Sequence, residues 1–155
     1  MKRIAIAVVL AVCTFGLAGC PLNSSQQQQA AQASLQASTV LRVAQQGEIA
    51  AAKNGLIPIA DDRFIQVQFE NVALLGKTLD SCIKTASGNG AATVCLGAAI
   101  TNVDQMNSNG GLFLKSATAK QDYLLAMTAI RTVFASIDAT LGGTPPAAPV
   151  IAPAN

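Results

Sequence analysis

The sequence of 155 residues predicts an all-α protein, a small antiparallel helical bundle of about four helices in which a disulfide joins one helical hairpin. First, small or apolar residues recur three and four positions apart along four segments, which is the spacing of one helix face. Second, clusters of glycine, asparagine and proline separate these segments. Third, Cys82 lies six residues before Gly88 and Cys95 lies five after Gly90, so a hairpin turning there places both cysteines at one height.

The first twenty residues have the order of an export signal. Lys2 and Arg3 form a short basic region, residues 4–15 are almost entirely apolar, and small residues follow. The apolar run is too short to span a membrane, which requires about 20 residues. The tetrapeptide Leu17-Ala18-Gly19-Cys20 resembles the lipobox of bacterial lipoproteins, which signal peptidase II cleaves before the cysteine. An ordinary secretory signal cleaved after Ala18 is the alternative.

The lipobox resemblance implies that residues 1–19 are a lipoprotein signal peptide and that Cys20 carries diacylglycerol and palmitate. It therefore implies a cell-envelope location in which the lipid on Cys20 makes the membrane a partner. Two or more acyl chains give stable anchoring, at about 0.8 kcal/mol per buried methylene. In enteric lipoproteins an aspartate after the cysteine typically signals retention in the inner membrane. Pro21 stands at that position, which favours the outer membrane over the inner membrane.

Removal of the signal leaves about 135 residues, which is the size of one domain. We expect a lipidated cysteine and polar leader over residues 20–29, the bundle domain over 30–141, and a disordered tail rich in proline and alanine over 142–155. The signal also takes two of the ten basic residues, so eight basic and eight acidic residues remain and the net charge is zero. This balance indicates no basic field that would hold nucleic acid or anionic lipid headgroups.

The first predicted helix covers about residues 25–54, and Gly55 stands where a C-terminal cap is expected. Its stripe consists almost entirely of small residues, namely Ala30, Ala33, Ala37, Val40, Ala44, Gly47 and Ala51. Such a stripe lets another helix approach closely while burying little apolar area. Packing within the bundle is the favoured interpretation, and docking of a partner helix is the alternative.

The second predicted helix starts at Asp61 and Asp62, which we expect to cap its N-terminus, and runs to the break at Gly88. Its stripe comprises Ile65, Phe69, Val72, Gly76, Leu79, Ile83 and Ala86. Residues 65–70 also alternate between apolar and polar, as a strand does. The helical spacing explains more than twenty residues and the strand pattern only six, so the length favours a helix.

The third predicted helix covers about residues 91–107 and ends at the break Asn107–Gly111, after which residues 112–114 could form a short strand. The fourth begins at Ser116, a suitable N-cap, and ends at Gly142. The third stripe comprises Ala92, Leu96, Ala99, Val103 and Met106, and the fourth comprises Tyr123, Met127, Ile130, Phe134, Ile137 and Leu141.

Cys82 and Cys95 are the only cysteines that remain if Cys13 leaves with the signal and Cys20 carries lipid. In an exported protein such a pair is expected to form a disulfide, which would stabilise the fold by about 3 kcal/mol. A zinc site is the alternative, but structural zinc requires four cysteine or histidine ligands and the chain has no histidine. We therefore expect no metal and no cofactor.

No constellation of residues predicts catalysis, because the usual general base, histidine, is missing. The segment Leu75-Gly76-Lys77-Thr78 contains the end of a phosphate-binding loop, yet Asn71 stands where the opening glycine is required. We expect no enzyme activity and no nucleic-acid partner, and we identify no small-molecule substrate.

Two function classes remain. The first is a protein-binding or assembly module of the cell envelope with an unidentified envelope protein as partner, comparable with the pilotins of secretion systems in architecture alone. The second is a structural or surface component, such as a spacer, a coat protein or a phage-derived exclusion lipoprotein. Exposure of the small-residue stripe in the first helix would favour binding, and its burial would favour the structural role.

Overall fold

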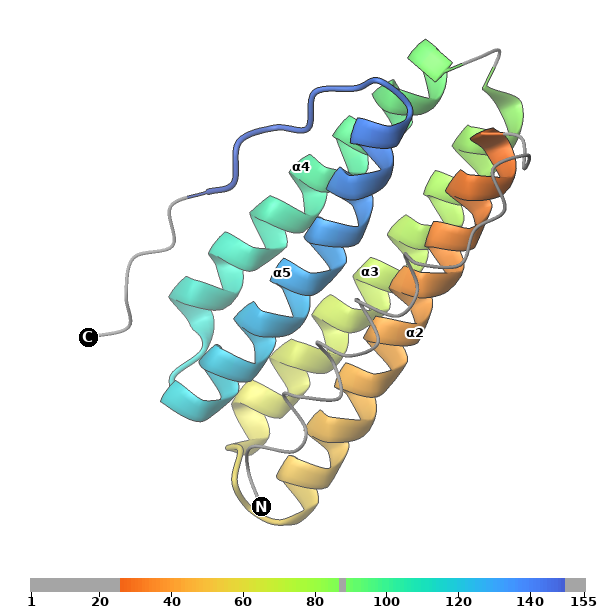
Figure 1. The fold of residues 1–155 in the computed structure, drawn as a ribbon. Helices are drawn as coiled ribbons and strands as arrows, with labels where there is room; N and C mark the ends of the chain where they lie inside the picture. The colour runs from red at the N-terminus through yellow and green to blue at the C-terminus, as the bar shows by residue number, and fades with distance from the viewer. Residues whose placement is uncertain (1–25, 87–88, 150–155) are drawn as a thin grey trace.

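The computed structural model describes residues 26–86 and 89–149, which form four α-helices and no strand. The helices are α2 (Gln26–Lys53), α3 (Ile59–Thr85), α4 (Asn89–Phe113) and α5 (Ala117–Thr140). They run alternately up and down, and α5 returns to pack against α2 so that the four helices close a ring (Figure 1). The predicted all-α antiparallel bundle is confirmed.

Helix α2 ends in the glycine cap that the sequence predicts. Gly55 adopts a left-handed conformation with φ of 67°, which glycine tolerates because it has no Cβ. The Leu56 N–H donates to the Ala51 carbonyl and the Gly55 N–H donates to the Ala52 carbonyl, each at 2.9 Å. These two bonds form a Schellman motif. At its other end α2 begins at Gln26, close to the predicted start at residue 25, and the domain boundaries stay a prediction.

The small-residue stripe of α2 packs inside the bundle. Of the members whose side chains are described, Ala37 and Val40 are buried, Ala44 and Ala51 pack against the core, and Gly47 is exposed. Helix α2 lies against both α3 and α5. Packing within the bundle is therefore confirmed for the described part of this stripe, apart from the exposed Gly47.

Helix α3 begins two residues before the aspartates that were expected to cap it. Pro58 is the N-cap and makes no side-chain capping bond, and its carbonyl accepts the Asp62 N–H at 2.9 Å. The predicted capping role is therefore wrong, because Asp61 and Asp62 lie inside the first turn. Residues 65–70 are helical, and the stripe members Ile65, Phe69, Val72, Leu79 and Ile83 are buried.

Helix α4 runs through the predicted break at 107–111 and ends only at Phe113, so the break and the alternative strand at 112–114 are wrong. Tertiary packing overrides the poor helix propensity of asparagine and glycine here. A Cβ placed on Gly110 would overlap the Tyr123 ring, so glycine lets α5 come close. The Tyr123 hydroxyl donates to the Met106 carbonyl at 2.8 Å, which fixes the ring against this turn of α4.

Helix α5 has the start, core face and end that the sequence predicts. The Ser116 side chain accepts the Ala119 N–H at 3.3 Å, which confirms the N-cap. All six stripe members from Tyr123 to Leu141 are buried. Gly142 has φ of 84°, and the Gly143 N–H donates to the Asp138 carbonyl at 2.8 Å, which closes the helix.

The Cys82–Cys95 disulfide joins α3 to α4 close to the turn between them, as predicted. The two Cα atoms are 6.0 Å apart, which is closer than the usual 8–10 Å between helix axes. The bridge fixes this hairpin at the end of the bundle where α2 begins (Figure 1).

The segment after α5 has no regular structure over residues 142–149 and turns back on the α4 side of the bundle (Figure 1). The Arg131 guanidinium of α5 links this segment to α4. It contacts Asp104 of α4 at 2.7 Å and also donates to the Pro146 carbonyl. Residues 150–155 lie outside the described residues, and disorder over 142–155 stays a prediction.

Gly110 provides a test of the α4–α5 packing. We expect Gly110→Ala to destabilise the fold by about 1–3 kcal/mol, because the methyl group would meet the Tyr123 ring in a filled core. Gly97→Ala is the matched control in the same helix, where an added methyl has open space. That control should be neutral or stabilising by up to about 1 kcal/mol. Urea denaturation followed by circular dichroism measures both, and equal effects would contradict the proposed contact.

Candidate functional site

The predicted site residues have different outcomes. Cys20, the expected lipid attachment site, lies outside the described residues, so lipidation stays a prediction. Cys82 and Cys95 are bonded to each other, so neither is a free thiol. Lys77 and Thr78 lie within α3, where the Thr78 hydroxyl donates to the Leu74 carbonyl at 3.1 Å. The backbone there is helical and does not form a phosphate-binding loop.

Residues 26–86 and 89–149 contain neither a metal-binding cluster nor a helix suited to span a membrane. These residues contain no group of three histidine, cysteine or acidic side chains placed to hold a metal ion. None of the helices in this part of the chain combines the length and the apolar character required to cross a membrane.

Large apolar side chains gather at the end of the bundle that carries the α2–α3 and α4–α5 connections, lowest in Figure 1. We call this end the loop end. Leu56 is 52% exposed, Ile59 73%, Leu112 79% and Phe113 62%. Burial of such side chains normally stabilises a protein by roughly 1.5–3 kcal/mol each, so four left in water form the most distinctive surface feature of the described chain.

Aromatic contacts bring the two connections of the loop end together. The Phe64 ring of α3 lies 5.8 Å from the Phe113 ring of α4 and 6.0 Å from the Tyr123 ring of α5, centroid to centroid. Tyr123 also stacks on Phe69 at 6.1 Å. These rings join α3, α4 and α5 just beneath the exposed side chains, so the loop end rests on a packed base.

Asp61 makes the second connection across the loop end. Its side chain is buried, with 3% exposure, and its carboxylate accepts the Ser116 N–H at 2.7 Å and the Lys115 N–H at 3.2 Å. Asp61 therefore holds the α4–α5 loop against the start of α3. The local sequence suggested only a helix cap for this residue. Its true partners could not be predicted because they lie 54 and 55 residues further along the chain.

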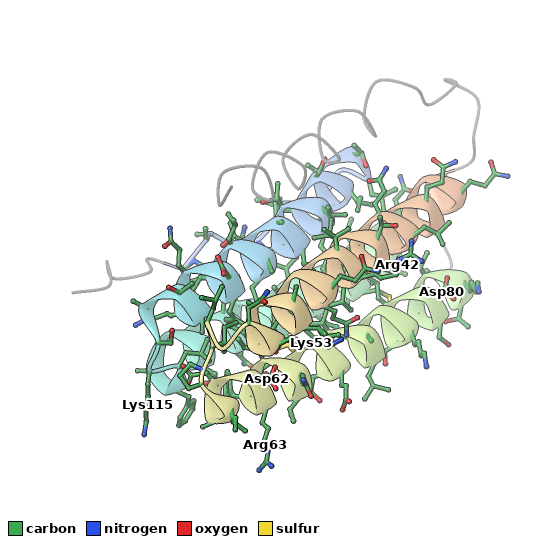
Figure 2. All side chains as sticks on the ribbon, turned by 90° about the horizontal axis from the view of Figure 1, so that it is seen from below. Arg42, Lys53, Asp62, Arg63, Asp80 and Lys115 are labelled. Carbon is green, nitrogen blue, oxygen red and sulfur yellow. A yellow bond between two sulfur atoms is a disulfide. The ribbon has the colours of Figure 1, made fainter. Side chains whose placement is uncertain are left out.

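Three basic side chains border the apolar surface. Lys53 ends α2, Arg63 lies one turn after Ile59 on the same face of α3, and Lys115 follows Phe113 in the next connection. All three are exposed, and Figure 2 shows Arg63 and Lys115 extending from this end of the bundle. Within the described chain, the ion pairs are Lys84–Asp80 and Arg131–Asp104, so neither involves these three.

Two aspartates of α3 lie near this border and carry opposing charge, but Asp61 is buried and Asp62 is half-buried, whereas the three basic side chains are exposed. Glu48 of α2 is buried, with 7% exposure, near the Asp62 carboxyl group, and its Oε1 has no hydrogen-bond partner among the described atoms. Burial, and then the neighbouring Asp62, raise the pKa of Glu48 to about 8, so Glu48 is mainly protonated at neutral pH. The Gln66 amide donates to both Asp62 oxygens at 3.2 Å. Sequence analysis missed Glu48, which sits beside Gly47 of the stripe.

Two further buried polar side chains do not join this site. Asn107 Oδ1 and Asp138 Oδ1 are buried without a hydrogen-bond partner among the described atoms. Burial raises the pKa of Asp138, which lies in the last turn of α5 at the opposite end from the loop end. The structure does not bring these groups together into a cluster that could perform acid–base chemistry.

The arrangement at the loop end suits binding. An exposed apolar surface with a cationic border can bury area against a partner, while it offers no nucleophile with an adjacent base. No protein-family model, no curated protein and no solved structure matches this chain. The site is therefore interpreted from its own residues.

Asp61 is expected to be essential to the loop end. Asp61→Ala removes the acceptor of two backbone N–H groups, and we expect a loss of about 2–3 kcal/mol of folding free energy. Asp80→Ala is the control, because that aspartate forms an exposed pair with Lys84 worth at most about 0.5 kcal/mol. Denaturant unfolding compares the two variants, and a loss in Asp61→Ala no larger than in the control would show that the contact is weak.

The raised pKa of Glu48 implies that the free energy of unfolding depends on pH. Its pKa is raised from 4.5 to about 8 on folding, so the folded state holds the proton more tightly than the unfolded state. Its contribution is fully present below pH 4.5, and stability decreases as the pH rises from there to about 8. Glu48→Gln should remove this decrease and raise stability above pH 8 by roughly 2–4 kcal/mol, at about 1.4 kcal/mol per pKa unit less partial solvation.

Unfolding free energies at pH 4.5 to 9 measure this effect as the difference between wild type and variant, which cancels the contribution of Asp138. Glu70→Gln is the control, because Glu70 is exposed on α3. Parallel pH profiles of wild type and Glu48→Gln would disprove the buried protonated state.

Proposed function

We propose that this protein is a lipid-anchored lipoprotein of the cell envelope that acts as a non-catalytic docking module, held by Cys20 and presenting its loop end to a partner protein. The observation that carries the proposal is the position of the loop end. Helix α2 begins at Gln26, six residues after Cys20, and its 28 residues extend about 42 Å to the α2–α3 connection. The start of α2 and the apolar surface therefore lie at opposite ends of the bundle (Figure 1).

The short tether sets the direction of the loop end. Six residues span at most about 21 Å when fully extended. An inverted bundle with its loop end in the anchoring membrane would hold Gln26 about 42 Å away from that membrane, beyond the reach of the tether. A bundle that stands upright on its tether thus presents the loop end away from the membrane, where an envelope protein can reach it. Pro21 supports the outer membrane as the location.

A structural or surface role is the second candidate, as a spacer, coat protein or phage-derived exclusion lipoprotein. The covered stripe of α2 supports it, because that face was the docking surface that the sequence suggested. The zero net charge of the processed chain supports it as well. Binding is favoured because a spacer gains nothing from four exposed apolar side chains at one end.

Cys20→Ala tests the anchor. We expect this change to abolish palmitate incorporation and to leave either uncleaved precursor or a protein released from the membrane fraction, because the thiol that carries the lipid is gone. Cys13→Ala is the matched control within the signal and should keep the label. Metabolic labelling followed by fractionation measures both, and palmitate that survives Cys20→Ala would refute the proposed attachment site.

A further inference from the structure

We infer that the loop end binds an apolar surface bordered by carboxylates on a partner protein. This inference rests on the proposed docking function and adds the chemistry of the partner. Its basis is the combination at one end of the bundle of four exposed apolar side chains with three basic side chains, Lys53, Arg63 and Lys115.

The apolar part of the surface sets the scale of the contact. At their measured exposures, Leu56, Ile59, Leu112 and Phe113 together offer on the order of 500 Å². A standard stable interface buries about 800 Å² on each partner. The four side chains therefore form the centre of an interface, and the surrounding border has to supply the rest of the area.

That border is cationic. Lys53, Arg63 and Lys115 are exposed and take part in no ion pair within the described ranges. The nearby Asp61 is buried, Asp62 is half-buried and Glu48 is mainly protonated, so the fully exposed charges of the border are the three cations, although the two aspartates reduce the net charge. The zero net charge predicted for the processed chain hides this local excess. Carboxylates on the partner would pair with these side chains, speed association and fix orientation.

The same features count against two other occupants. A second copy would bring a second set of lysine and arginine side chains against the first, which opposes association at this surface. An upright, inverted bundle that inserts its loop end into the anchoring membrane is excluded, because the tether is shorter than the bundle. A partner protein with acidic groups remains.

The loop end is also pre-organised. Asp61 binds the α4–α5 loop, and Phe64 packs between Phe113 and Tyr123. Little further ordering is then required on binding, which favours affinity from a small surface.

Photo-crosslinking in living cells tests the inference. A photoreactive phenylalanine analogue replaces Ile59 or Leu112 in the full-length protein, and Val94 serves as the control because it is 72% exposed near the disulfide. We expect adducts from positions 59 and 112 and none from 94. Peptide mapping of the adduct should identify a partner surface with apolar residues and at least two aspartates or glutamates.

Charge reversal tests the border separately. Arg63→Glu combined with Lys115→Glu should lower the adduct yield about tenfold, while Lys77→Glu, an exposed lysine of α3 away from the loop end, should leave it unchanged. Circular dichroism of each variant confirms folding.

Four results would overturn the inference: equal adducts from position 94, an adduct with a second copy or with phospholipid, a mapped surface without carboxylates, or an unchanged yield after charge reversal. Palmitate labelling of the same cells reports the anchor independently. If the protein carries no palmitate but still forms adducts from positions 59 and 112, the lipid anchor is refuted and the docking surface is not. If the protein carries palmitate but forms no adducts from these positions, the docking surface is refuted and the lipid anchor is not.

Discussion

The buried Asp61 carboxylate joins parts of the chain that are 54 and 55 residues apart, and the loop end depends on this contact. It accepts the N–H groups of Lys115 and Ser116, so the start of α3 and the start of α5 are held together. Phe64 is then placed beside Phe113 and Tyr123, and Tyr123 lies against Gly110. A charged acceptor that satisfies two buried donors is among the stronger hydrogen-bonding arrangements in proteins.

The α3–α4 pair is fixed at both of its ends. Asp61 and the aromatic contacts act at the loop end, and the Cys82–Cys95 bond acts at the other. Helix α5 then closes the ring by placing its large apolar side chains between α4 and α2, whose own face is made of small residues. Large side chains opposite small ones allow the helices to pack closely. The result is a rigid base that keeps four apolar side chains in solvent.

Charge is distributed unevenly over the described part of the chain. Burial keeps Glu48 mainly protonated, and of the neighbouring carboxylates Asp61 is buried and Asp62 is half-buried. Lys53, Arg63 and Lys115 therefore dominate the solvent-facing charge of the loop end. Net charge constrains interactions with long polyanions, but recognition by a small surface depends on the few charges that border it.

The sequence by itself determined the four helices, their buried stripes, the caps at Gly55, Ser116 and Gly142, and the α3–α4 disulfide. These features are local, because a period of 3.6 residues or a left-handed glycine is set by near neighbours. Tertiary structure alone decided the partners of Asp61, the burial of Glu48, the passage of α4 through residues 107–111, and the gathering of apolar and basic side chains at the loop end. Each of these depends on contacts between segments far apart in the chain, and helical periodicity carries no information about such contacts.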